Sequence, residues 1–104
     1  MQVKPDIVAE VHLLTTENGG RQGPTPSTYW GCLAKIEGEY WDCSVLLDEV
    51  GSLAPGTTTV VPIKFVSPVP GLKIGNQFRL WEGSFVGTAR ILSVSSVLES
   101  QKDA

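Results

Sequence analysis

The sequence predicts an all-β domain, folded as a closed barrel or a sandwich of six short antiparallel strands. Apolar and polar residues alternate with the period of two that is typical of strands. Eleven glycines and seven prolines break the 104-residue chain into short segments, and none of these has the pattern of an amphipathic helix. A chain of this length forms one domain with its own core. We expect that domain over residues 6–98, after a short extension over 1–5 and before a flexible tail over 99–104.

Six segments carry the strand pattern, and each one ends at turn-forming residues. They span residues 6–14, 28–36, 39–47, 57–66, 76–81 and 85–97. The fourth segment is rich in β-branched residues and is a clear strand. It also contains Pro62, which cannot donate a hydrogen bond to a neighbouring strand. This residue therefore indicates an edge strand or a bulge.

The second and third segments are expected to form a hairpin around Glu37 and Gly38. Glycine readily adopts the positive φ that a two-residue hairpin turn needs. A turn at these two residues fixes which residues lie opposite one another. The pairs on one face are then Ala34 with Trp41, Cys32 with Cys43, and Trp30 with Val45. All six are apolar, so this face should point into the core, while Tyr29 should lie at the surface.

The sequence offers little of the chemistry that enzymes need. It has no phosphate-binding P-loop and no nucleophile elbow, and His12 is its only histidine. Cys32 and Cys43 are interpreted as small core residues, with a disulfide as the alternative. Two thiolates without further ligands do not complete a zinc site. We therefore expect no catalytic residues, no metal and no cofactor.

The net charge is −3, and it is unevenly distributed. Residues 1–52 carry eight acids and three bases, a balance of −5, whereas residues 53–104 carry three acids and five bases, a balance of +2. A chain with this net charge binds nucleic acid poorly on average, although its second half is basic enough to form a local basic surface. There is neither an apolar leader nor an apolar run long enough to span a bilayer. We expect a soluble, cytoplasmic protein.

Four motifs resemble the C-terminal domain of elongation factor Tu. They are DxxAEVxLLxxExGGR over residues 6–21, LxPG over 53–56, VxIxFxxP over 61–68 and FRLxEGxxVGxA over 78–89. Their order is that of the family, and together they extend across residues 6–94. The resemblance implies a six-stranded antiparallel β-barrel. In that family the domain has no catalytic role, and it contacts aminoacyl-tRNA, the GTPase domain and a nucleotide-exchange partner.

The resemblance also implies a tentative site for RNA or a protein partner. Its residues are Gly19, Gly20, Arg21, Gln22, Tyr29, Ser67 and Gly83. Three basic positions of the family are changed: Gln22 replaces a histidine, Trp30 replaces a second arginine and Ser67 replaces a common lysine. Fewer cations mean fewer phosphate contacts, which supply much of the affinity for nucleic acid.

The loop over residues 17–27, ENGGRQGPTPS, leaves three interpretations open. It is a turn-rich connection in which Arg21 pairs with an acid, a phosphate-binding loop, or part of a protein-binding rim. The function expected from the whole sequence is that of a non-enzymatic binding module without GTP binding. Its partner is expected to be aminoacyl-tRNA or a translation-factor protein. The alternative is a protein-interaction or inhibitor barrel unrelated to translation.

Overall fold

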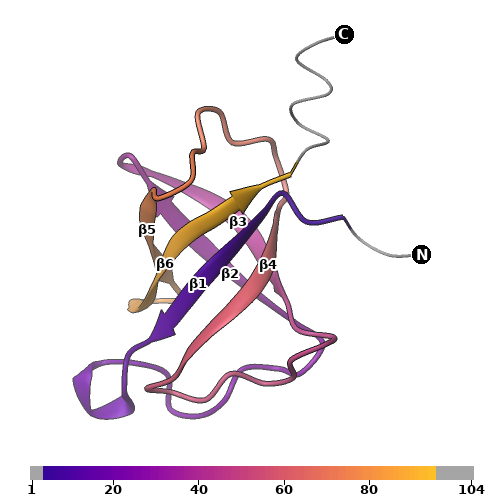
Figure 1. The fold of residues 1–104 in the computed structure, drawn as a ribbon. Helices are drawn as coiled ribbons and strands as arrows, with labels where there is room; N and C mark the ends of the chain where they lie inside the picture. Colours follow the sequence, from indigo (N-terminus) through magenta and orange to yellow (C-terminus); the bar gives the residue numbers. More distant parts are fainter. Residues whose placement is uncertain (1–3, 96–104) are drawn as a thin grey trace, which may run out of the picture.

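The computed structural model describes residues 4–95 and shows a closed antiparallel barrel (Figure 1). Its strands are β1 (Ile7–Leu13), β2 (Tyr29–Ile36), β3 (Glu39–Leu46), β4 (Thr58–Phe65), β5 (Gln77–Trp81) and β6 (Phe85–Val94). A single 3₁₀ turn, η1 (Thr16–Asn18), follows β1. Around the barrel the order is β1-β4-β3-β2-β5-β6, and β6 closes the ring by pairing with β1. The expected fold class, a six-stranded antiparallel β-barrel, is confirmed.

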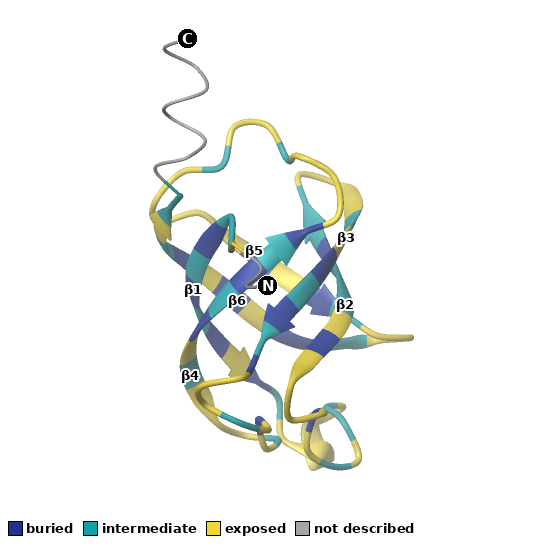
Figure 2. Ribbon diagram, turned by 90° about the vertical axis from the view of Figure 1, so that its right-hand side faces the viewer, coloured by how far each residue is buried: buried dark blue, intermediate teal, exposed yellow. Residues whose placement is uncertain are grey.

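The alternation seen in the sequence separates the inside of the barrel from its surface, as the banded colouring in Figure 2 shows. In β1 the four alternate residues from Ile7 to Leu13 are almost completely buried. Trp30, Phe65 and Leu80 are among the large side chains that fill the interior. This core holds the strands in place, and the loops at both ends of the barrel are built on it.

The β2–β3 hairpin has the predicted register. Cys32 lies opposite Cys43, and Trp30 lies opposite Val45. Both turn residues have positive φ, 48° at Glu37 and 84° at Gly38. Two successive positive φ values define the turn whose twist matches that of the flanking strands, so the local turn and the apolar face favour the same pairing.

The pairing between β3 and β4 is short, and the two strands separate beyond it. It covers only Cys43–Val45 with Phe65–Ile63. The next residue of β4 is Pro62, which has no N–H to donate across the gap. Pro62 also pairs with Val8 of β1, without a bulge in that ladder. The expectation of an edge strand or a bulge was therefore wrong in detail, because β4 has a partner on each side and Pro62 lies where one ladder stops.

The observed strand ends differ from the expected ones by one residue in most cases. The exception is the last strand, which was expected over residues 85–97 and runs over Phe85–Val94. Residues 96 and 97 lie outside the described part of the chain, as do residues 1–3 of the expected extension and the expected tail over 99–104. The η1 turn was not expected, because three residues are too few to show a helical period.

Candidate functional site

The loop after β1 has a defined shape, although its sequence is rich in turn residues. The Thr15 hydroxyl accepts a hydrogen bond from the Asn18 N–H at 3.2 Å and so caps η1. Gly19 ends the turn with a φ of 95°. At Gly20 a Cβ would lie 2.2 Å from the carbonyl oxygen of Leu14, so no other residue fits there without a shift of the backbone. The two glycines thus shape the loop and set the position of the arginine that follows.

Arg21 is bound within the protein on several sides. Its Nη1 donates to both carboxylate oxygens of Glu82 at 2.5 Å. Its Nε and Nη2 donate to the carbonyl oxygens of Gly23 and Pro24, each at 3.2 Å. The guanidinium carbon lies 5.6 Å from the centre of the Trp30 ring, at a distance typical of a cation–π contact. Most of the donors of Arg21 are therefore already occupied.

Glu82 connects this loop to the core. Its Oε2 accepts a hydrogen bond at 2.9 Å from Nε1 of Trp30, a side chain that is only 1% exposed. The indole N–H of a buried tryptophan needs such a partner, since an unpaired buried donor is costly. Arg21, Glu82 and Trp30 therefore form one unit that fastens the loop to the β5–β6 turn. Of the three interpretations of the loop, the structure supports the one in which Arg21 pairs with an acid.

Only some of the other residues of the tentative site lie beside this unit. Tyr29 shares a hollow of about 440 Å³ with Arg21 and Glu82, and it is 59% exposed. Gln22 is exposed beside them. Gly83, with a φ of 80°, follows Glu82 in the β5–β6 turn. Ser67 is exposed in the loop after β4, so a different element supplies it.

The surface between Gly83 and the loop of Ser67 is acidic rather than basic. Gly83 and Val66, the residue before Ser67, line the same shallow hollow of about 420 Å³ on the outside of β2 and β3. Asp42 and Glu82 also line this hollow. Arg21 compensates the charge of Glu82, and Asp42 leaves the hollow with a net negative charge that disfavours the RNA contact implied by the resemblance.

Cys32 and Cys43 are free thiols, with their sulfur atoms 3.7 Å apart. The hydrogen bond with Cys43, followed by burial, raises the pKa of the Cys32 thiol above its ordinary value. A thiol that resists ionisation is a poor nucleophile and a poor metal ligand. The interpretation of both residues as core thiols agrees with this geometry.

A groove that the sequence did not indicate lies where β3 and β4 separate. This β3–β4 groove has a volume of about 680 Å³. Its apolar wall consists of Tyr29, Leu46, Val50, Val60 and Pro62, and Asp48 and Glu49 lie along it. Tyr29, Val50 and Val60 are 59%, 47% and 50% exposed. The only signal for this groove in the sequence is Pro62, a proline inside a strand.

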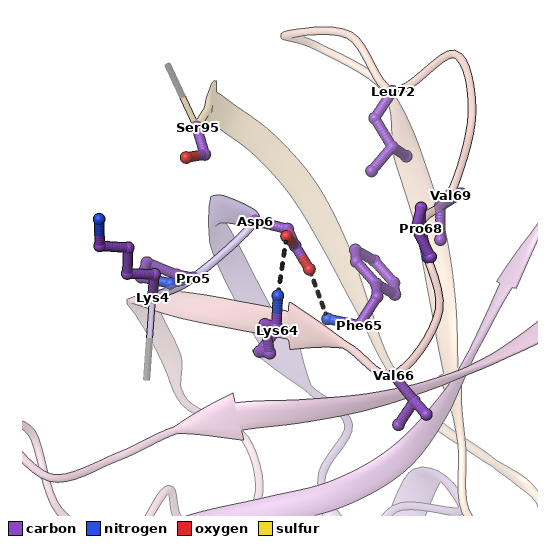
Figure 3. A pocket seen from close by; sticks show the side chains of 10 residues that line it. All are labelled: Lys4, Pro5, Asp6, Lys64, Phe65, Val66, Pro68, Val69, Leu72 and Ser95. Atoms are coloured by element: carbon purple, nitrogen blue, oxygen red, sulfur yellow. Dashed lines mark hydrogen bonds and ion pairs between the residues drawn. The ribbon is translucent and has the colours of Figure 1, made fainter. Parts of the chain in front are cut away.

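The groove is bordered by a second hollow of about 350 Å³, which Figure 3 shows from close by. The Asp6 carboxylate lies there, and its two oxygens accept hydrogen bonds from Lys64 Nζ at 3.3 Å and from the Phe65 N–H at 2.8 Å. Because Lys64 lines both hollows, this bond keeps the only cation of the groove wall occupied. The charge that the groove presents is therefore acidic.

A cationic and aromatic surface is formed by residues of β2, β3, β5 and β6. This Lys35–Arg79 face consists of Lys35, Tyr40, Arg79, Trp81 and Phe85. The Arg79 guanidinium lies 3.9 Å from the centre of the Phe85 ring, and Lys35 Nζ lies 5.5 Å from that of Tyr40. Neither cation belongs to the three ion pairs found within residues 4–95.

No group of three or more metal-ligating side chains gathers within the described residues. The same residues contain no helix with the length and hydrophobicity that a span of the bilayer requires. No protein-family model matches the chain, and no curated protein matches it.

Proposed function

We propose that this chain is a non-enzymatic module that binds another protein through the β3–β4 groove. The proposal rests on one observation: three large apolar side chains, Tyr29, Val50 and Val60, stay about half exposed along a hollow of about 680 Å³. Covering the exposed part of each one favours binding by about 1 kcal/mol. Apolar patches of this kind in a concave surface are typical of protein-binding sites.

A translation-factor protein is the partner class that the resemblance to elongation factor Tu suggests. The engagement of Arg21 disfavours RNA at the tentative site. A phosphate would have to compete there with Glu82, which is already bound at short distance. The hollow beside Arg21 has no second cation in its lining, and RNA gains much of its affinity from cations that contact its phosphates.

The test compares protein capture from a nuclease-treated lysate by the natural sequence and by matched variants. Val60→Glu places a charge in the groove, whereas Ile74→Glu places the same charge at an exposed apolar residue that does not line it. The proposal expects one captured protein that is lost with Val60→Glu and kept with Ile74→Glu. Equal capture by both variants would refute binding through the groove.

RNA binding is a second candidate function, and the Lys35–Arg79 face favours it. Outward-facing aromatic rings beside unpaired cations are typical of surfaces that stack nucleic-acid bases. The measurement is filter binding of aminoacylated and uncharged tRNA at low and moderate salt. If this face binds RNA, Arg79→Glu weakens RNA binding and lowers the salt slope by about one unit or more. Arg21→Glu then weakens RNA binding less than Arg79→Glu does. Equal binding by the natural sequence and Arg79→Glu would rule out this face.

A further inference from the structure

We infer that the β3–β4 groove receives its partner as an extended peptide, which adds as a strand to the free side of β4 at Thr58–Val60. The inference rests on the protein-binding function proposed above and specifies the partner's conformation and chemistry. It follows from the direction of the backbone groups in β4, from the path of β3, and from the charges beside the groove.

The backbone groups of β4 point alternately toward its two neighbouring strands. Near its start, the carbonyl of Thr57 accepts a hydrogen bond from Leu13, at the end of β1, at 2.9 Å. Just past its end, the N–H of Val66 donates to the carbonyl of Asp42 in β3 at 3.0 Å. Odd-numbered residues of β4 therefore face β1, and even-numbered residues face β3. The N–H and C=O groups of Val60 belong to the second set.

β3 is no longer beside β4 at this point. The N–H of Leu47 bonds to Thr28 at 2.8 Å, which holds the chain toward β2. The N–H of Gly51 then bonds back to the Leu47 carbonyl at 2.7 Å, so residues 47–51 turn away. Within residues 4–95, no strand pairs with the β3-facing side of Thr58–Val60. A strand side without a partner is a template for adding another strand.

The groove also indicates the side chains of the peptide. Successive residues of a strand point to opposite faces, so alternate peptide side chains would contact the apolar wall beside Val60 and Pro62. Asp48 and Glu49 lie along the groove, and neither takes part in an ion pair found in the described residues. Lys64 is already bound to Asp6. The peptide that fits has apolar residues at alternate positions and a lysine or arginine that reaches the two acids.

A single substitution separates strand addition from other ways of filling the groove. Val60→Pro removes the N–H that faces the groove but keeps an apolar side chain. Because this N–H does not face β1, the β1–β4 ladder stays intact, as it does at Pro62. Val60→Ile is the matched control, since it keeps both the N–H and the β-branched shape.

The experiment selects short random peptides that bind the purified natural protein and measures their affinities for the variants. We expect alternating apolar peptides with a basic residue. Val60→Pro should weaken them about tenfold, the cost of about one hydrogen bond, while Val60→Ile leaves them unchanged. Thermal unfolding followed by circular dichroism confirms that each variant is folded. Hydrogen exchange at the Val60 amide should slow when peptide is added.

The possible outcomes separate this inference from the proposed function. If Val60→Glu abolishes binding but Val60→Pro does not, and exchange at Val60 is unchanged, the groove binds proteins and strand addition is wrong. If Val60→Glu has no effect on the selected peptides, or no peptide is selected, the peptide-binding groove itself is refuted. A Val60→Pro variant that does not fold leaves the exchange measurement on the natural protein as the deciding result.

Discussion

Replacing Arg21 by methionine tests whether the loop arginine is a structural residue. Methionine keeps most of the aliphatic length of the side chain but removes the charge and every donor. Three contributions are lost: the ion pair with Glu82, the hydrogen bonds to two loop carbonyls, and the contact with the Trp30 ring. The Arg21 and Glu82 side chains are 20% and 36% exposed, so water screens part of their attraction.

The expected loss of stability follows from these contributions. We take about 0.5 kcal/mol for the screened ion pair, about 1 kcal/mol for the two 3.2 Å hydrogen bonds together, and about 0.5 kcal/mol for the cation–π contact. The free energy of unfolding should therefore fall by about 2 kcal/mol. For a domain of this size, about 1 kcal/mol corresponds to roughly 5 °C in the melting temperature, so the expected fall is about 10 °C.

The assay is thermal unfolding followed by circular dichroism, with Lys73→Met as the matched control. Lys73 is exposed and belongs to none of the ion pairs within residues 4–95, so its replacement removes the same charge at little cost. A fall of less than about 3 °C for Arg21→Met would refute the reasoning. The guanidinium would then be free in solution, and the interpretation of Arg21 as a ligand-binding residue would regain its support.

Three further predictions concern the core of the barrel. Gly87→Ala places a Cβ 2.6 Å from a backbone oxygen of β1 and should cost at least about 2 kcal/mol in urea unfolding, whereas Gly31→Ala, with nothing within 4 Å, should cost far less. Trp30→Phe removes the hydrogen bond to Glu82 and should lower stability by at least about 1 kcal/mol; a melting temperature equal to that of the natural protein would contradict the role of that bond. The pKa of the Cys32 thiol is raised in the folded state above its ordinary value of 9.0. The protonated thiol therefore contributes fully to stability below about pH 9.0, and above that pH its contribution decreases by at most about 1.4 kcal/mol per pH unit. Stability measured across alkaline pH should therefore fall, and Cys32→Ala should make that fall shallower.

The sequence predicted the elements that depend on turns and on the pairing of residues close together in the chain. The β2–β3 register followed from a turn whose two residues both take positive φ, and from apolar pairs on one face. The partner of Arg21 was not predictable in this way, since Glu82 lies 61 residues further along the chain. The β3–β4 groove is harder still to foresee. It arises where two strands stop pairing, and no residue pattern marks that point except Pro62.

The pairing of β1 with β6 has a consequence for how the chain folds as it is made. β1 is the first strand to be synthesised, yet one of its two neighbours is the last strand of the ring. Until residues 85–94 have been added, β1 and β5 both keep an unsatisfied side, and the interior stays open to water. The barrel therefore cannot close strand by strand during synthesis. Its closing contacts join distant parts of the chain, so we expect a slow final step in which partly folded molecules are prone to associate through those two open strands.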